Sequence, residues 1–398
     1  MMEPQPAETI PEISVVMPCL NEAETVAVSI RKAKAAFQTM GINGEVVIAD
    51  NGSKDGSREI ATAEGARVVR VEESGYGSAL RGGVSAAKAP WVLMGDADDS
   101  YDFSAIGPFV DGLRDGSDLV MGCRMPRGGG TVKPGAMPWK HRWIGNPVLT
   151  FIGRLLFRCP AHDFHCGMRA FTKDAYNRMD LRTTGMEFAS EMVIKSTLNG
   201  LSISETPITL HPDGRSRAPH LRSWRDGWRH LRFMLLFSPR WLFLIPGVTL
   251  TLFGLITLSL LAAGRMIFGR VVLDVGTMAA SSMLLTVGVQ LLFFAVFIRV
   301  FAVSAGFLPP NKKLRRVLEI FTLEGGILVG LLMLLVGGAI FLIAFRDWQL
   351  AGFQGLSYSD NLRRIIPAST MVVLGIQFLF GSFFLGVLNL KHAQASEH

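Results

Sequence analysis

The chain has 398 residues, of which 49% are apolar, and its formal net charge is +7. Long apolar runs begin after Trp241, so the composition indicates a membrane protein with a soluble first half. Five of the seven excess positive charges follow Trp241, and the soluble half carries no compact stripe of Lys and Arg. The basic balance therefore does not indicate a nucleic-acid partner.

The first 240 residues alternate short β-rich runs with helical stretches, which predicts an α/β fold with a largely parallel sheet. The predicted strands are Ile13–Met17, Glu45–Ala49, Arg67–Val71, Trp91–Gly95 and Asp118–Gly122. The predicted helices are Glu24–Met40, Gly56–Glu64, Tyr76–Ala87 and Ser104–Arg114. The Gly- and Pro-rich segment Met125–Gly145 follows, and we expect a long, mobile loop there.

Leu221–Phe237 is predicted to be an amphipathic helix that lies at the membrane surface. One stripe at helical spacing contains Leu221, Trp224, Trp228, Leu231 and Leu235. A second stripe contains Arg222, Arg225, Arg229 and Arg232. Trp on one face and Arg on another suit the lipid headgroup level. The alternative is a helix docked on its own domain.

Four apolar segments are each long enough to cross a bilayer, which takes about 20 residues. They are Trp241–Ala263, Met278–Val300, Gly325–Phe345 and Ala368–Leu388. Basic residues concentrate before the first segment, between the second and third, and after the fourth, including Arg240, Lys312, Lys313, Arg315, Arg316 and Lys391. The positive-inside rule then predicts a multi-pass protein of the cell (inner) membrane with a cytoplasmic catalytic domain. The predicted domains are residues 1–220, the interfacial helix 221–240 and the membrane domain 241–398.

Acidic residues follow three of the predicted strands, and ligands of open α/β sheets bind beyond the carboxyl ends of the strands. The strand exits read Pro18-Cys19-Leu20-Asn21-Glu22, Asp50-Asn51-Gly52-Ser53 and Asp96-Ala97-Asp98-Asp99, and the fifth strand leads to Arg124. Clustered carboxylates repel a diphosphate unless a divalent cation bridges them. Because carboxylate oxygens favour hard cations, we expect Mg²⁺ or Mn²⁺ between these residues and a diphosphate leaving group.

Pro-x-x-Asn-Glu, Asp-Asn-Gly-Ser-x-Asp and Asp-Ala-Asp occur in this order on these strands. In that arrangement they resemble the motifs of family 2 glycosyltransferases of the GT-A fold. Further residues resemble dolichol-phosphate mannose synthases and bacterial polyprenyl-phosphate glycosyltransferases: Asp163, Gly167-Met168-Arg169, Glu191 and Gly214-x-Ser216-Arg217. The resemblance covers roughly residues 11–240 and implies a GT-A domain, a nucleotide-sugar donor and a lipid-linked acceptor.

The resemblance also implies roles for the matching residues. The donor-binding residues would be Pro18, Leu20, Glu22, Asp50, Asp96, Ala97, Asp98 and Arg217. Asp96, Asp98 and Asp99 would hold the metal, with Asp98 as the main ligand. Many relatives have Gln soon after Asp-x-Asp, whereas Asp99 and Ser100 stand here, so Asp99, Ser100 or Asp102 could complete the metal shell.

The implied acceptor is an undecaprenyl or dolichyl phosphate, which carries about −1.5 to −2 charges at neutral pH and is already a nucleophile. We therefore expect a single displacement with inversion of a hexose, glucose or mannose, from a UDP- or GDP-sugar. Arg124, Lys140 and Arg142 are the candidates for binding the acceptor phosphate, and Asp98, Arg124 and Glu191 for catalysis. Glu191 could equally be a helix residue paired with an arginine.

Two alternatives stay open. A neutral lipid hydroxyl, as on a diacylglycerol or sphingoid lipid, would require a general base, and Glu191 or Asp163 would then be essential. The four spans could also form a module that flips lipid-linked sugar, although they hold little charge beyond Arg299. A homo-oligomer is possible in either case.

Overall fold

The structure is a computed structural model that describes residues 10–216, 223–305, 308, 322–354 and 357–395. The chain divides into two compact units, Met1–Met234 and Leu235–His398. The division falls near the end of helix α8 (Ser223–Leu236), so most of the predicted interfacial helix belongs to the first unit.

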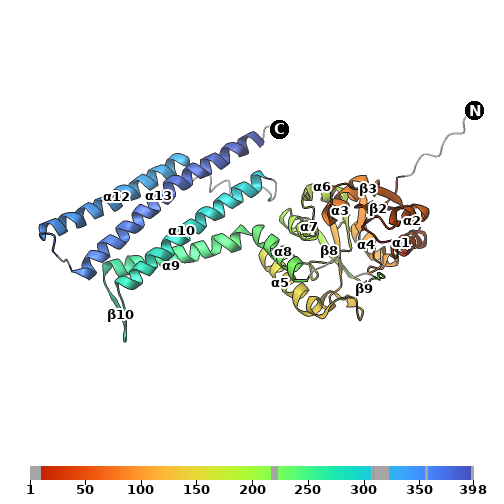
Figure 1. The fold of residues 1–398 in the computed structure, drawn as a ribbon, viewed down its shortest axis with the longest axis horizontal. Coiled ribbons are helices and arrows are strands. Elements are labelled where there is room, and N and C mark those ends of the chain that lie inside the picture. Colours follow the sequence, from red (N-terminus) through yellow and green to blue (C-terminus); the bar gives the residue numbers. More distant parts are fainter. Residues whose placement is uncertain (1–9, 217–222, 306–307, 309–321, 355–356, 396–398) are drawn as a thin grey trace, which may run out of the picture. The chain divides into compact units, whose positions relative to one another are not determined.

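A seven-stranded sheet in the order β3-β2-β1-β4-β7-β5-β8 forms the centre of the first unit (Figure 1). Its strands are β1 (Ile13–Cys19), β2 (Gly44–Asp50), β3 (Arg67–Arg70), β4 (Trp91–Met94), β5 (Leu119–Cys123), β7 (Arg169–Thr172) and β8 (Ile203–Pro207). All neighbouring pairs are parallel except the two that β7 makes with β4 and β5. Because β7 opposes both, β1, β2, β4 and β5 end at the same edge. The predicted α/β class is confirmed.

Helices cover both faces of this sheet because their apolar side chains repeat at helical spacing. The buried apolar residues of α1 (Val26–Met40) that show this spacing are Val26, Ile30, Ala33 and Phe37. They share one core with α4 (Gly107–Arg114). On the other face, α3 (Tyr76–Ala86) approaches so closely that a Cβ on Gly83 would lie 2.4 Å from Val16 Cγ1. Only glycine allows that contact.

The remaining helices of this unit are α2 (Ser57–Ala63), α5 (Asn146–Phe157), α6 (Lys173–Met179), α7 (Glu187–Leu198) and α8. Residues 125–145, predicted to be one long loop, contain short regular elements. These are η2 (Pro126–Gly128), β6 (Thr131–Val132) and the π-helical turn η3 (His141–Gly145). β6 pairs with β9 (Thr209–Leu210), and η3 continues directly into α5. The chain is therefore more ordered here than its Gly and Pro content indicates.

The second unit contains the four membrane spans that the sequence predicts, by length and composition. They are Arg240–Ala263, Val275–Ser304, Leu323–Leu350 and Tyr358–Leu388. The corresponding helices are α9 (Ile245–Ala263, continuing from the π-helical turn η4, Arg240–Leu244), α10 (Val275–Ser304), α12 (Leu323–Leu350) and α13 (Tyr358–Ala395). A hairpin of β10 (Met266–Phe268) and β11 (Val271–Leu273) joins α9 to α10.

Small residues let the backbones of the spans approach closely, as is usual within a bilayer. A Cβ on Gly254 of α9 would lie 2.5 Å from a backbone nitrogen of α10. Gly330 of α12 and Gly375 of α13 each face the other's carbonyl oxygen in the same way. The hydroxyl of Thr257 donates to Ser281 Oγ at 2.8 Å, which adds a polar contact between α9 and α10.

Candidate active site

Asp50 ends β2 and is almost completely buried, with 1% of its surface exposed. Its carboxylate accepts hydrogen bonds from the N–H groups of Gly52 (3.2 Å) and Ser53 (3.1 Å). Arg58 Nε lies 3.9 Å from the same carboxylate. The loop after β2 thus holds a negative charge in a fixed orientation at the edge where a base and ribose are predicted to bind.

Serine hydroxyls tie the end of β1 to the end of β2. The N–H of Asn21 donates to Ser53 Oγ (2.9 Å), and the N–H of Glu22 donates to Ser57 Oγ (2.8 Å). Asn21 has a φ of 59°, in the left-handed region, which turns the chain sharply after the strand. The predicted donor-binding residues of this turn are Pro18, Leu20 and Glu22. The structure places them beside the Asp50 loop.

Asp96 and Asp98 follow β4, on either side of the buried Ala97, at the same edge. Burial, together with the charge of Asp98, raises the pKa of Asp96 to about 7, although Tyr76 hydrogen-bonds to it. Asp98 Oδ1 accepts hydrogen bonds from Ser100 through its N–H (3.1 Å) and its hydroxyl (2.6 Å). The carboxylates of Asp96 and Asp98 supply the hard oxygen donors that fit Mg²⁺ or Mn²⁺.

Asp99, predicted to be a third metal ligand, is instead bound by Lys32 of α1, whose Nζ lies 2.7 Å from its Oδ1. The other candidates are also engaged, because the Ser100 hydroxyl donates to Asp98 and Asp102 accepts from Ser104 to cap the 3₁₀ turn η1 (Phe103–Ala105). Within the described ranges, no three His, Cys, Asp or Glu side chains are grouped to hold a metal. A cation at Asp96 and Asp98 would need further oxygens from its ligand.

Arg215 is a site residue that the sequence analysis did not select. Its guanidinium lies 3.1 Å from Glu22, 2.8 Å from Asp98 and 3.0 Å from Asp213. Arg217, the residue implied by the resemblance, lies outside the described residues. The pattern Gly-x-Ser-Arg was the available signal. This pattern contains two arginines, one on each side of Ser216. The structure shows that Arg215 makes the contacts with Glu22, Asp98 and Asp213.

Arg124 follows β5, as predicted, but its guanidinium is buried in an ion pair with Asp163. Its Nε and Nη2 lie 2.7 and 2.9 Å from the two carboxylate oxygens, and its N–H donates to the same group at 3.0 Å. Burial opposes both charges, yet the pair holds the pKa of Asp163 below its ordinary value and raises that of Arg124. Because Asp163 engages Nε and Nη2, Arg124 could bind a phosphate through Nη1 but not through the bidentate fork of its guanidinium.

Glu191 lies on α7 and is fully buried. Its carboxylate accepts from the N–H of Arg182 (3.0 Å) and from the N–H (2.9 Å) and hydroxyl (2.7 Å) of Thr183, and Lys195 Nζ lies 3.0 Å away. Of the two readings left open, these contacts favour the structural one, with a lysine rather than an arginine as partner. The residue holds the segment before α7 against that helix.

Lys140, one of the other predicted phosphate ligands, immediately precedes η3, and Arg142, the second, lies within this turn. Lys140 is exposed, and the Arg142 guanidinium stacks 5.3 Å above the ring of Trp143. Trp139, which precedes Lys140 in the chain, and Trp143 are both exposed.

The surface that continues from Trp143 along α5 is an apolar stripe without protein cover in the described structure. Its members lie four, three and four residues apart and are 46–66% exposed: Ile144, Val148, Phe151 and Leu155. The buried residues of α5 are Thr150, Gly153 and Phe157, so the stripe points away from the domain. Arg154 and Arg158 are exposed beside it. No prediction from the sequence covered this helix.

Helix α8 contacts its own domain on one face and leaves an aromatic side chain on another. His230 Nδ1 lies 2.8 Å from Ser190 Oγ of α7, whereas Trp228 is 56% exposed. One face of α8 thus contacts α7, as in the alternative of a docked helix. Trp228 is exposed on another face, and its contact with lipid stays a prediction. The side chains of Leu221 and Trp224 lie outside the described residues.

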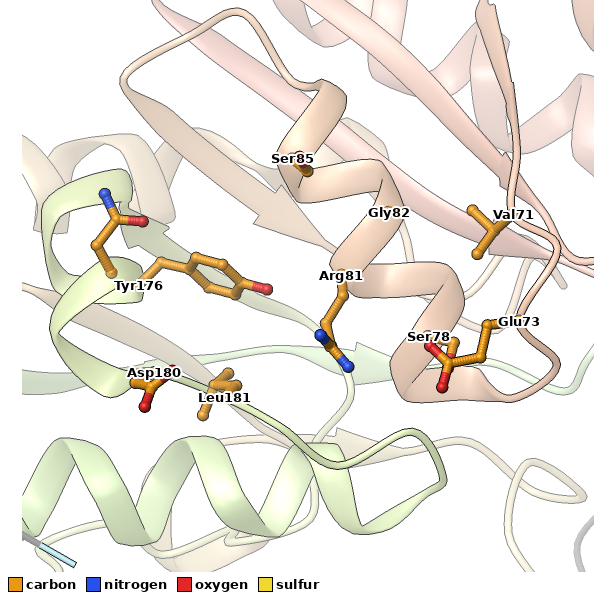
Figure 2. A pocket seen from close by; sticks show the side chains of 10 residues that line it. Val71, Glu73, Ser78, Arg81, Gly82, Ser85, Tyr176, Asp180 and Leu181 are labelled. Carbon is orange, nitrogen blue, oxygen red and sulfur yellow. The ribbon is translucent and has the colours of Figure 1, made fainter. Parts of the chain in front are cut away.

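A pocket of about 490 Å³ lies against α3, apart from the strand exits that carry the predicted site residues (Figure 2). Figure 2 shows Arg81 between Tyr176 on one side and Glu73 on the other. Glu73 belongs to the segment after β3, whose carbonyl groups at Val71 and Glu73 accept hydrogen bonds from Asn51 Nδ2 at 3.0 and 2.8 Å. The pocket thus borders the site through this segment.

Comparisons with known proteins cover both units. Residues 14–179 match the model for glycosyl transferase family 2, and residues 296–389 match the C-terminal transmembrane region of glycosyltransferase family 2. The chain is 38% identical over 393 residues to a low-salt glycan biosynthesis hexosyltransferase of Haloferax volcanii, covering 96% of this chain and 90% of that relative.

It is also 33% identical over 201 residues to the dolichyl-phosphate hexose transferase of the same organism, covering 50% of this chain and 83% of the relative. Among solved structures it is similar to glucosyl-3-phosphoglycerate synthase of Mycobacterium tuberculosis in complex with Mn²⁺, UDP and glucosyl-3-phosphoglycerate. The identity is 22% and the TM-score 0.43, with 59% of this chain and 84% of the other covered.

Asp163→Asn should destabilise the first unit, because it leaves the buried guanidinium of Arg124 without a counter-ion. Removing one partner of a buried pair costs about 3–5 kcal/mol. Thermal unfolding of the detergent-solubilised protein measures the change. Asp111→Asn, on the exposed face of α4, is the matched control and should stay within about 0.5 kcal/mol.

The pH dependence of this difference follows from the lowered pKa of Asp163 in the folded state. The stabilisation by the ion pair is present above the ordinary pKa of 3.8 and is lost as the pH falls through the lower folded value. The gap between wild type and Asp163→Asn should therefore be constant from about pH 8 to 5 and shrink only below about pH 4. A gap that closes near pH 6 would contradict the assignment.

Proposed function

Because the chain belongs to glycosyltransferase family 2, we propose that it transfers a hexose from a UDP- or GDP-sugar to a polyprenyl phosphate at a membrane surface. The observation that carries the proposal is the pair of carboxylates Asp96 and Asp98 at the carboxyl edge of the sheet, in a multi-pass membrane protein. The similarity to a dolichyl-phosphate hexose transferase supports a lipid phosphate as the acceptor. Glucose or mannose is the expected sugar.

The donor would lie across the exits of β1, β2 and β4. The carboxylates of Asp50 and Glu22, which are buried at these exits, would accept hydrogen bonds from the base and ribose, with Pro18 and Leu20 as apolar contacts. Asp96 and Asp98 would hold Mg²⁺ or Mn²⁺, which when bound neutralises charge on the departing diphosphate. Arg217 would close over the donor.

The acceptor phosphate supplies its own nucleophilic oxygen. That oxygen forms a bond to C1 of the hexose as the bond from C1 to the diphosphate breaks, so the configuration at C1 inverts. A phosphate with a second pKa near 6 is largely ionised at neutral pH, and no proton has to be removed during attack. Lys140, Arg142 and the remaining nitrogen of Arg124 would orient it, since catalysis rests on positioning and charge.

The contacts of two carboxylates weigh against a lipid hydroxyl as the acceptor. A neutral alcohol needs a general base, for which the sequence offers Glu191 and Asp163. Glu191 accepts from three donors and faces Lys195, and Asp163 is bound by both arms of Arg124. Neither is exposed. A group engaged in this way is poorly placed to take a proton from a substrate.

The apolar stripe on α5 suggests how the catalytic unit meets its lipid substrate. A helix with one face buried in its domain and an apolar face exposed, flanked by arginines, suits the boundary of headgroups and acyl chains. We infer that α5 lies in this boundary, together with Trp228 of α8. The basic residues that flank the spans favour the cytoplasmic face of the cell membrane for this unit.

Asp98→Asn should lower transfer to below about 1% of the wild-type rate, because the side chain loses the charge that holds the metal. Transfer from labelled UDP- and GDP-hexoses to a short polyprenyl phosphate measures the effect. Asp102→Asn, which alters a nearby turn, should retain most activity. Excess EDTA should stop wild-type transfer and Mg²⁺ or Mn²⁺ should restore it; full activity in EDTA would contradict the proposed use of a metal.

Phe151→Glu should reduce kcat/KM for a long-chain polyprenyl phosphate in vesicles about tenfold, because a charge replaces a ring that is expected to lie among acyl chains. Activity on a short, water-soluble acceptor should change less than about twofold, since the strand exits are untouched. Val28→Glu, at an exposed apolar position of α1, is the control. Equal losses on both acceptors would mean that the stripe does not contact lipid.

A further inference from the structure

The Arg215 guanidinium sits at the edge of the sheet where the proposed function requires a metal cation. It bridges Glu22, at the end of β1, and Asp98, at the end of β4, and Asp213 adds a third carboxylate. Its side chain is 13% exposed and Asp98 is buried, so the contact is largely shielded from water. A charged side chain in such surroundings is held by its partners rather than by solvent.

We propose that Arg215 is an internal counter-ion that occupies Asp98 in the free enzyme, and that a divalent cation can bind Asp98 only when this guanidinium leaves. The inference rests on the proposed use of a metal at Asp98. It goes further by assigning Arg215, which the Gly-x-Ser-Arg pattern does not distinguish from Arg217, to the control of metal entry. Binding of the metal to Asp98 and release of Arg215 from Asp98 then occur together, as the exchange of one cation for the other.

The geometry of Asp98 leaves little room for both cations. Its Oδ1 is taken by the N–H and hydroxyl of Ser100, and its Oδ2 by Arg215 Nη2 at 2.8 Å. A metal ion lies about 2.1 Å from a carboxylate oxygen. Bound to Oδ2, it would lie within about 5 Å of the guanidinium, where two positive charges in a shielded site repel each other strongly.

The backbone beside Arg215 has anchors of its own. The N–H of Gly214 donates to the carbonyl of Asp98 (3.0 Å), and the N–H and hydroxyl of Ser216 donate to Glu24 (2.7 and 2.6 Å). The guanidinium can therefore leave Asp98 by rotation of its side chain while the chain on either side stays attached. A donor diphosphate brings negative charge to the same place and offers the displaced guanidinium a partner.

Two consequences follow for the free enzyme. Its affinity for a divalent cation should be low, because the cation must displace Arg215 from Asp98. A donor diphosphate should raise that affinity, since it adds oxygen ligands and compensates the guanidinium. Metal and donor would then bind together, which limits the time that the carboxylates hold a metal without a substrate.

The test is Mn²⁺ binding to the full-length, detergent-solubilised protein without a donor, followed by the electron paramagnetic resonance signal of free Mn²⁺. Arg215→Ala and Arg215→Gln should tighten binding about 10- to 100-fold, as expected when a competing charge-assisted contact is removed. Arg215→Lys should tighten it much less, because the charge remains. Arg114→Ala is the matched control, since Arg114 pairs with Glu12 before β1, and should change binding less than about twofold.

The same titrations with UDP or GDP present separate this proposal from the proposed function. If nucleotide increases Mn²⁺ binding by the wild type but the folded Arg215→Ala and Arg215→Gln variants bind Mn²⁺ no more tightly than the wild type without it, the counter-ion role is wrong and metal use stands. If the wild type binds no Mn²⁺ with either nucleotide and transfers sugar in excess EDTA, metal use is wrong and this inference falls with it. Thermal unfolding of each variant verifies that it is folded.

Discussion

Negative charge gathered at one edge of the sheet constrains the rest of the first unit. Asp50, Asp96, Asp98 and Glu22 meet there because β1, β2 and β4 run parallel and end together. Asp50 accepts hydrogen bonds from the amides of its loop, Arg215 pairs with Glu22 and Asp98, and Asp96 is hydrogen-bonded to Tyr76. Burial beside Asp98 raises the pKa of Asp96. A diphosphate at such an edge requires added positive charge. In the proposed account a metal would replace Arg215 at Asp98, and the released guanidinium would face the diphosphate.

The parts of the fold that depend on local pattern could be predicted from the sequence. The predicted strand Ile13–Met17 corresponds to β1, the predicted helix Tyr76–Ala87 to α3, and the four apolar segments to the observed spans, with differences only at their ends. The insertion of β7 between β4 and β5 could not be predicted. The pairing of β7 with β4 and β5 joins residues that are distant in the chain, and it produces no periodic pattern in the sequence of any of these strands.

In the candidate site, too, local features could be predicted from the sequence and contacts between distant residues could not. Residues within a motif could be chosen because strand ends locate them, but partners distant in the chain could not. Asp99 stands next to Asp98 yet pairs with Lys32, 67 positions earlier, and Arg124 pairs with Asp163, 39 positions later. Arg215 and Arg217 could not be told apart by spacing. The stripe on α5 follows a Gly- and Pro-rich segment whose composition predicts a loop, so no helical pattern is expected to start there.

The central claim is transfer of a hexose to a lipid phosphate with inversion. The most direct test incubates the protein with a labelled α-linked UDP- or GDP-hexose and equal amounts of a short polyprenyl phosphate and the matching alcohol. The purified lipid product is then examined by ³¹P and ¹H NMR. We predict a phosphodiester whose hexose has the β configuration at C1. A phosphorus-free glycoside of the alcohol, or a phosphodiester with the α configuration retained, would contradict the account.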